Sequence, residues 1–178
     1  MYKSFGKVDL LFLNGIKNYL FPEKKKKTVI YCIAASLLIS VVFFLNGIIF
    51  GSLLSAAAFL IFLYMFVTAP KKAVKVNMSH IERSGSDSFM YTVTFSENGA
   101  EIKNHTENTV SNAEFYMFSV LVETDNAYVI FTRNGNFIPV FKEYIGDGNR
   151  KEFLRYLMSN APGLKLKLKK NKKFYCHF

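Results

Sequence analysis

The stretch Thr28–Pro70 reads TVIYCIAASLLISVVFFLNGIIFGSLLSAAAFLIFLYMFVTAP and contains no Asp, Glu, Lys, Arg or His. One transmembrane helix needs only about 20 apolar residues. A single helix over this whole stretch would be about 65 Å long at about 1.5 Å per residue, whereas the hydrocarbon core of a bilayer is about 30 Å thick. The sequence therefore predicts two membrane-spanning helices.

The most turn-prone point of this stretch is the dipeptide Asn46-Gly47, close to its middle. Asn-Gly pairs favour tight turns. We therefore predict a transmembrane hairpin over residues 28–70, with spans at 28–45 and 48–68 and the turn at 46–47. The small residues Gly51, Ser52 and Ser55 form a candidate packing face between the two spans, because small side chains let helices approach closely in a membrane.

Basic residues flank both outer ends of the predicted hairpin, and the turn carries no charge. The flanking residues are Lys24, Lys25, Lys26 and Lys27 before the first span, and Lys71, Lys72 and Lys75 after the second. Short loops rich in Lys and Arg stay on the cytoplasmic side of a membrane. Both termini are therefore predicted to be cytoplasmic, with the seven lysines against anionic phospholipid head groups of the lipid bilayer. A cleaved signal peptide is not expected, because the apolar run begins too late and is too long.

The net charge of +10 does not indicate nucleic-acid binding, because of where the charges lie. Residues 88–160 hold 6 basic and 9 acidic side chains, and residues 161–178 hold 6 basic and no acidic ones. The candidate globular region is thus acidic, and the cations are collected beside the membrane and in the tail. We expect no nucleic acid among the partners.

Residues 1–27 form a separate cytoplasmic N-terminal segment in this reading. Between Phe5 and Phe21, apolar residues partly follow helical spacing among several lysines. Such an amphipathic helix would lie in the plane of the lipid head groups. The alternative is a helix packed on the C-terminal domain, and in both cases Pro22 ends it.

After Lys75 the pattern changes to short segments rich in β-branched and aromatic residues, separated by turns. Ser88–Ser96 alternates, with Phe89, Tyr91, Val93 and Phe95 on one face, and Glu97-Asn98-Gly99 is a hairpin turn. Further strands are predicted at Ala100–His105, Thr109–Ala113, Val120–Thr124, Ala127–Thr132 and Asn136–Phe141. Regular short strands of this kind favour an antiparallel sandwich or a partly open barrel.

One helix is expected after these strands. Asp147 is a natural N-cap, the apolar face includes Phe153 and Leu157, and Ala161-Pro162-Gly163 ends it. Leu164–Lys173 alternates Leu and Lys, so the basic tail, residues 164–178, extends a sheet edge, lies on the membrane or stays disordered. The predicted fold class is a membrane α-helical hairpin plus a small α+β domain at 71–163.

The order of elements and several loose motifs resemble the bacterial YcxB-like family. Phe89–Gly99 resembles its opening strand and acidic-Gly turn, Phe115–Thr124 its aromatic-to-Glu-Thr stretch, and Arg150–Leu157 its closing helix. Phe137-Ile138-Pro139 resembles its hydrophobic-Pro motif. The chain departs from the family by having no Trp and by having Val140 where a Lys often follows the Pro. The resemblance implies a pleckstrin-homology-like (PH-like) domain, a bacterial cytoplasmic (inner) membrane and no established activity.

Candidate chemistry is sparse along the chain. His80, His105 and His177 have no partner at metal-ligand spacing, and Cys32 and Cys176 are expected in different environments. Glu97, Glu101, Glu107, Glu123 and Asp125 lie at or beside predicted turns, where acidic residues are commonly solvated. We therefore predict no catalytic, cofactor-binding or metal-binding residues, and no enzyme.

Two functions fit these patterns. The first is a non-enzymatic, membrane-anchored PH-like domain that acts as an interaction or regulatory module, with a protein partner or a homo-oligomer. Anchoring favours this function because it raises the effective concentration of the domain for other membrane-bound partners. The alternative is a small membrane-active protein, holin-like or pore-forming, with a basic lipid-binding tail.

Overall fold

The computed structural model describes residues 2–145 and 149–168. The chain divides into two compact units: Lys17–Asn77 is one, and residues 1–16 together with 78–178 form the other. We call the first the hairpin unit and the second the sheet domain. This division differs from the predicted boundaries, because residues from before the hairpin belong to the domain that follows it.

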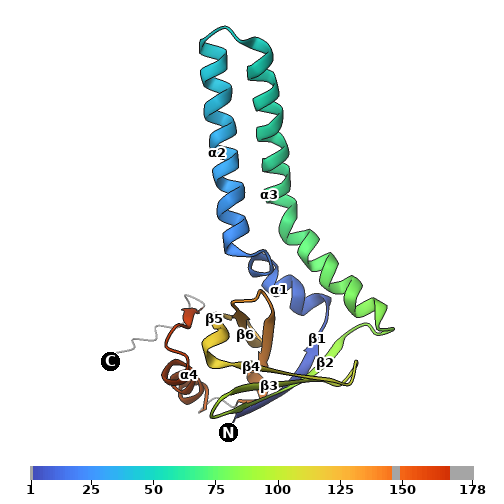
Figure 1. The fold of residues 1–178 in the computed structure, drawn as a ribbon. Helices are drawn as coiled ribbons and strands as arrows, with labels where there is room; N and C mark the ends of the chain where they lie inside the picture. Colours follow the sequence, from blue (N-terminus) through green and yellow to red (C-terminus); the bar gives the residue numbers. More distant parts are fainter. Residues whose placement is uncertain (1, 146–148, 169–178) are drawn as a thin grey trace. The chain divides into compact units, whose positions relative to one another are not determined.

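The hairpin unit contains the two predicted long helices, α2 (Glu23–Leu45) and the first part of α3 (Ile49–Arg83), which run side by side (Figure 1). The turn lies at the predicted place. The α3 helix differs from the prediction, because it continues through Pro70 to Arg83 instead of ending near Thr68. An interior proline removes one backbone hydrogen bond and crowds the carbonyl four residues earlier, which can kink a helix without ending it. The residues after Pro70 contain no further helix breaker before Gly85, whose φ of 76° ends the helix.

Sheet A has the order β1-β2-β3-β4, and all its neighbours are antiparallel. Its strands are β1 (Tyr2–Val8), β2 (Phe89–Ser96), β3 (Gly99–Asn104) and β4 (Thr109–Glu114). The first strand corrects the sequence analysis, because Phe5–Val8 is extended and the N-terminal helix, α1, covers only Leu10–Leu20. The strand is favoured because it buries Ser4 and Val8 and pairs along its whole length with β2.

Sheet B has the order β7-β6-β5-β8. Its strands are β5 (Phe118–Glu123), β6 (Ala127–Thr132), β7 (Phe137–Phe141) and β8 (Lys165–Lys167). The short 3-10 helices η1 (Phe115–Met117) and η2 (Lys142–Tyr144) precede β5 and follow β7. The β8 strand runs parallel to β5, so the described start of the basic tail extends a sheet edge.

The predicted C-terminal helix is present as α4 (Asn149–Asn160). Its predicted cap, Asp147, lies outside the described residues. Phe153 and Leu157 of α4 are fully buried, and the Phe153 ring lies 5.2 Å from those of Phe95 in β2 and Tyr2 in β1. The helix therefore closes the main hydrophobic core, which both sheets line.

The described strands form two open sheets and no closed barrel. Strands β1 and β7 meet without a ladder between them: the backbone N–H of Phe141 donates to the Ser4 hydroxyl at 2.7 Å. Gly6 of β1 lies flat against the Phe141 ring, where a Cβ atom would be 2.5 Å from the ring carbons. The domain thus has the predicted α+β composition, while its PH-like character stays a prediction.

Candidate functional site

The apolar side chains of α2 and α3 are mostly exposed. Of the most apolar stretch of each helix, 6% of the residues are buried in α2 and 0% in α3, with mean hydropathies of 2.5 and 2.2. Leu45 and Phe50, on either side of the turn, are 76% and 74% exposed. A core helix of a water-soluble domain would bury such residues. Both helices are therefore long and apolar enough to cross a membrane, and their surface suits lipid.

The turn between these helices is built by Asn46 and Gly47, as predicted. Gly47 has a φ of 72°, which side chains disfavour, and its N–H donates to the Phe44 carbonyl at 3.0 Å. The side-chain amide of Asn46 donates to the Val42 carbonyl at 2.8 Å. The two residues thus satisfy free carbonyl groups at the end of α2 without adding charge.

Small residues pack the two helices together. The Ser40 hydroxyl of α2 donates to the Ser52 carbonyl of α3 at 3.1 Å. A Cβ atom on Gly51 would lie 2.7 Å from Cδ2 of Phe43, so the ring occupies the space that a side chain would need. The predicted packing face is confirmed at Gly51 and Ser52, whereas the Ser55 hydroxyl donates to the Gly51 carbonyl of its own helix.

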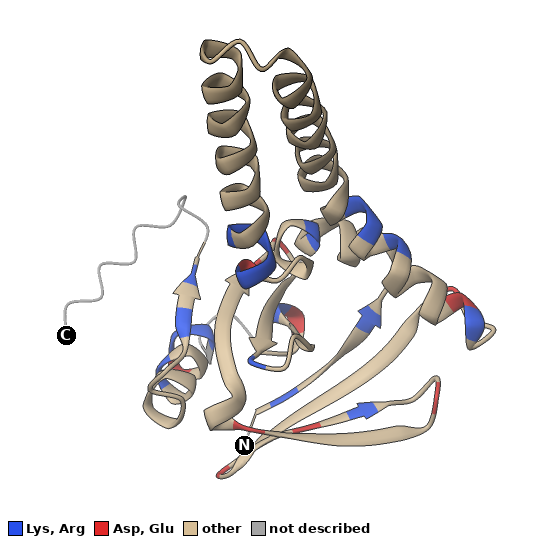
Figure 2. Cartoon of the chain, turned by 45° about the horizontal axis from the view of Figure 1, so that its top comes forward, with Lys and Arg blue, Asp and Glu red and all other residues tan. Residues whose placement is uncertain are grey.

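The seven flanking lysines lie at the opposite end of the hairpin from the turn, and all are exposed (Figure 2). Lys24–Lys27 belong to the first turns of α2, and Lys71, Lys72 and Lys75 lie on α3. The ammonium groups of Lys26 and Lys72 lie 5.9 and 5.8 Å from the ring centroids of Phe66 and Tyr64. Lysine side chains that run along apolar surface toward a polar layer have this geometry. The contact between Lys26 of α2 and Phe66 of α3 places the two lysine groups at the same end of the hairpin.

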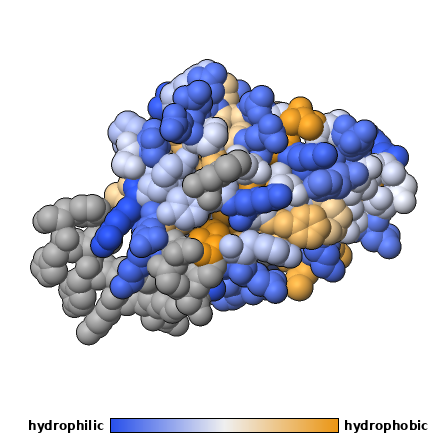
Figure 3. All heavy atoms as spheres, turned by 90° about the horizontal axis from the view of Figure 1, so that it is seen from below, coloured by the Kyte–Doolittle hydropathy of each residue, from blue (hydrophilic) through white to orange (hydrophobic). Residues whose placement is uncertain are grey.

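In contrast to the hairpin, the face of the molecule drawn in Figure 3 is mostly hydrophilic, and its apolar residues lie in small separate patches. Continuous apolar surface marks a contact with lipid or protein. Among the described segments, the hairpin carries the long runs of exposed apolar residues.

Helix α1 packs on the sheet domain, which is the second of the two alternatives given for the N-terminal segment. Leu13 and Ile16 are fully buried, and the Phe12 ring lies 5.6 Å from the Phe141 ring. Leu10, Leu11 and Tyr19 of the same helix are exposed. These exposed apolar side chains are the ones left for the head-group contact predicted by the first alternative.

Asp9 caps the start of α1. Its carboxylate accepts the Phe12 N–H at 2.9 Å and pairs with Lys7 at 3.1 Å. Burial raises the pKa of Asp9, but the hydrogen bond from Phe12 and the contact with Lys7 together outweigh it, so the net pKa lies below 3.8. The cap is therefore charged at neutral pH.

A polar cluster closes the end of sheet A where β3 turns into β4. The Asn104 amide donates to the Glu107 carboxylate at 3.0 Å, and His80 Nδ1 lies 3.7 Å from the same carboxylate. Burial raises the pKa of Tyr91 to about 12, and the nearby Glu107 charge adds to the shift. The sequence singled out His80 and Glu107 separately but not their meeting, which depends on the length of α3. The cluster fastens the end of α3 to the sheet.

Lys142 is buried, which the sequence did not indicate. Its ammonium donates to the Glu123 carboxylate at 2.7 Å and to the Thr124 carbonyl at 2.6 Å, and it lies 5.0 Å from the centre of the Tyr128 ring. Burial raises the pKa of Tyr128, the Glu123 charge raises it further, and Arg150 opposes the shift. The lysine thus links η2 to the end of β5, and this contact stabilises the fold.

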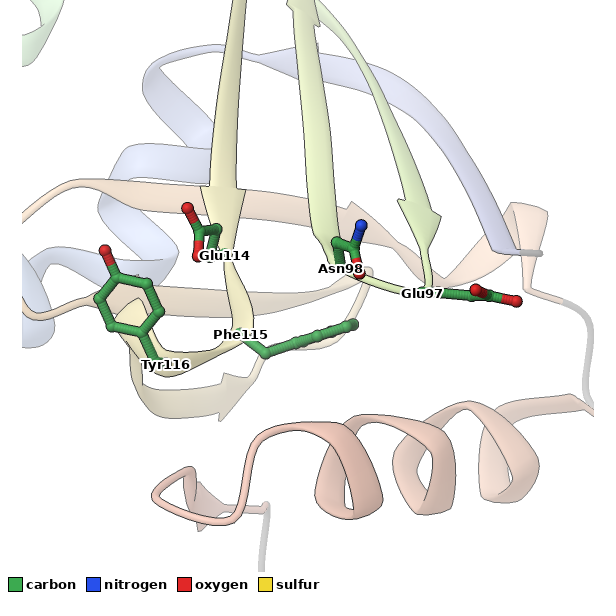
Figure 4. Close-up of a pocket in the computed structure, with 5 residues that line it drawn as sticks. All are labelled: Glu97, Asn98, Glu114, Phe115 and Tyr116. Carbon is green, nitrogen blue, oxygen red and sulfur yellow. The ribbon is translucent and has the colours of Figure 1, made fainter.

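A shallow hollow of about 540 Å³ is lined by Glu97, Asn98, Glu114, Phe115 and Tyr116. Glu97 comes from the β2–β3 turn, and its side chain points away from that of Glu114 at the end of β4 (Figure 4). The two carboxylates therefore do not converge on one point, as an acid–base pair or a cation site requires. Across residues 2–145 and 149–168, no three His, Cys, Asp or Glu side chains are close enough together to hold a metal ion.

The described residues thus bring the two predicted lysine groups together at one end of the hairpin, and the turn lies at the other end. The chain matches no family model and no curated protein. The YcxB-like resemblance therefore stays a prediction, and the hairpin with its lysines is the best-supported candidate functional site.

Proposed function

We propose that this protein is a non-enzymatic, membrane-anchored interaction module. The hairpin crosses a bacterial inner membrane twice, and the sheet domain, a PH-like domain of the YcxB-like kind, works at the cytoplasmic face. The observation that carries the proposal is the charge-free stretch Thr28–Pro70, whose apolar side chains face outward. Seven exposed lysines flank this stretch at one end of the hairpin. Each Lys near an anionic leaflet contributes about 1 kcal/mol of attraction.

The pairing of β1 with β2 supports this topology independently of the lysines. Strand β1 precedes the hairpin and β2 follows it, and seven consecutive residue pairs join them. Two strands of one ladder must lie on the same side of a membrane. A hairpin that enters the bilayer between them therefore crosses it an even number of times, which agrees with two spans.

Cysteine accessibility in intact cells tests the topology. Cys32 and Cys176 are first replaced by Ser, and single cysteines are then placed at the turn (Ile48→Cys) or on the domain at the exposed Tyr116 (Tyr116→Cys). We expect a membrane-impermeant maleimide to label the turn in intact cells, and the domain only after permeabilisation. Labelling of Tyr116→Cys in intact cells would contradict a cytoplasmic domain.

A second measurement separates an anchor from a pore. The full chain and a truncation after Arg83, which keeps all of α3, are expressed in cells loaded with a small fluorescent dye. We expect no dye release from either protein, because Thr28–Pro70 contains no Asp, Glu, Lys, Arg or His to line a path for water or ions. Release by both proteins would favour the membrane-active alternative.

A further inference from the structure

The two sheets of the domain have four edge strands, and three of them are protected. Edge strands present unpaired N–H and C=O groups, so proteins usually cover them or interrupt them with Pro, Lys or short length. In sheet B, β8 is only three residues long and has exposed lysines at both ends, and β7 contains Pro139. Strands β1 and β7 also cover each other's edges, and the Phe141 N–H donates a hydrogen bond to the Ser4 hydroxyl between them.

The fourth edge, β4, carries none of these protections. It is six residues long, contains no Lys, Pro or Gly, and keeps a regular register with β3 from Thr109 to Glu114. Thr109, Val110, Ser111 and Asn112 are all exposed. No described strand pairs with the outer side of β4. This edge is therefore a template for adding a strand.

We propose that β4 pairs antiparallel with β4 of a second copy of this chain, so that the two copies of sheet A become one continuous sheet. A two-fold axis between antiparallel strands places one residue opposite itself. With Ser111 at the axis, Val110 lies opposite Asn112 of the second copy, and Thr109 lies opposite Ala113. No charged residue then faces a like charge, because the only charged residue of β4, Glu114, lies opposite the uncharged Asn108.

The inference rests on the proposed membrane anchoring, which favours a second copy over other partners. Copies held in one bilayer with the same orientation meet at a raised effective concentration. Residues 88–160, which include β4, hold more acidic than basic side chains and would repel an acidic strand. The exposed run Thr109–Asn112 carries no charge that would attract a basic strand, whereas the same uncharged run of a second copy suits it.

Disulfide trapping tests this pairing in the full chain, in native membranes, with Cys32 and Cys176 replaced by Ser. Opposed residues of antiparallel strands have Cα atoms about 4.5 to 5.5 Å apart, within the range of a disulfide. In the Ser111-centred register, the two copies of residue 112 are offset by two positions along the strands and lie out of range. We expect Ser111→Cys to form a dimer under mild oxidation, and Asn112→Cys to form at least tenfold less.

A charge variant tests the same register without a cysteine. Ser111→Lys places two ammonium groups opposite each other, whereas Ser111→Thr keeps an uncharged, strand-favouring residue. We expect light scattering in mild detergent to give a monomer for the Lys variant and a dimer for the Thr variant. The sheet domain should have the same thermal unfolding midpoint in both variants. A dimer that survives Ser111→Lys would overturn the β4 interface.

The outcomes separate this inference from the proposed function. If the chain is absent from the membrane fraction, the anchoring proposal fails and this inference loses its basis. If the chain is in the membrane and Ser111→Cys stays monomeric, or cross-links to a different protein, only the pairing of two β4 strands is overturned. Equal cross-linking of Ser111→Cys and Asn112→Cys would overturn the register.

Discussion

Single residues in the sheet domain hold its elements together through buried polar contacts. Lys142 is the clearest example, because its ammonium has lost most of its water and depends on Glu123, Thr124 and Tyr128. Removing one member of a buried ion pair leaves the other charge without compensation, which costs more than the pair itself contributes.

Lys142→Met is expected to lower the free energy of unfolding by about 3 kcal/mol, because the largely buried Glu123 carboxylate loses the ammonium group that balances its charge. The double variant Lys142→Met, Glu123→Gln is expected to recover part of that loss, since the carboxylate charge that Lys142 balances is then removed as well. Near-UV circular dichroism during urea unfolding in detergent measures both, because the chain has ten tyrosines and no Trp. Lys103→Met, at an exposed site on β3, is the control. Equal stability of Lys142→Met and this control would contradict the role given to the pair.

The partly buried hydroxyl group of Tyr91 makes the stability of the sheet domain depend on pH. Its pKa is about 12 in the folded domain and 10.0 when unperturbed. Between these two values the folded state keeps a proton that the unfolded state has lost, so this contribution to stability is complete below pH 10 and decreases as the pH rises toward 12. We expect the unfolding midpoint to fall more steeply from pH 9 to pH 11 in the native chain than in Tyr91→Phe. Tyr116→Phe, at an exposed site, is the control and should follow the native chain. Equally steep falls of the unfolding midpoint in the native chain and in Tyr91→Phe would contradict this role of Tyr91.

At the scale of elements, hairpin packing depends on close approach between α2 and α3. Gly51→Val introduces a side chain where Phe43 already lies, and overpacking costs about 1 to 3 kcal/mol. Ser40→Cys and Ser52→Cys report the approach, because the two hydroxyl oxygens lie 3.4 Å apart. With Cys32 and Cys176 replaced by Ser, we expect the disulfide between positions 40 and 52 to form about tenfold more slowly in Gly51→Val.

Leu54→Val, on the exposed side of α3, is the matched control for Gly51→Val. We expect it to leave the cross-linking rate unchanged. A rate that falls equally in both variants would mean that helix propensity, and not the packing at Gly51, controls the approach.

Local sequence patterns predicted most of the helices and strands. The features that these patterns missed depend on contacts between residues far apart in the sequence. The six strands from β2 to β7 alternate or are rich in β-branched residues, and tight turns separate them, so their approximate bounds could be read from the sequence. Strand β1 could not, because Gly6 and Lys3 weaken its own pattern and its partner lies beyond the hairpin. The candidate hairpin site was predictable because absence of charge is a local property. The burial of Lys142 depends on strand register, which the sequence does not reveal.

At the scale of the whole molecule, the sheet domain is assembled from both sides of the hairpin in the sequence. Residues 1–16 supply β1, with Ser4 and Val8 buried, and the first part of α1, and residues 78–178 supply the other elements. We expect a protein in which residues 17–77 are replaced by a flexible linker of about 20 residues, with a root-mean-square span of about 25 Å, to be folded and soluble. Residues 78–178 alone should aggregate, because β2 then has an open apolar edge.

Gel filtration and far-UV circular dichroism compare these two deletions. A monodisperse, folded 78–178 fragment with the same thermal midpoint as the linked domain would show that β1 is dispensable. Loss of solubility in both proteins would show that the sheet domain needs the hairpin for more than connection.

The ladder between β1 and β2 also sets an order of events during synthesis. Val8 and Phe89 are partners although about 80 residues separate them, so at about 5 to 20 residues per second β1 waits roughly 4 to 16 s for its partner to leave the ribosome. The apolar hairpin emerges during that interval. A chain whose hairpin entered the bilayer only once would leave β1 and β2 in different compartments. In the proposed topology, completion of the domain is thus coupled to correct insertion, and a failed insertion would leave β1 and β2 unpaired.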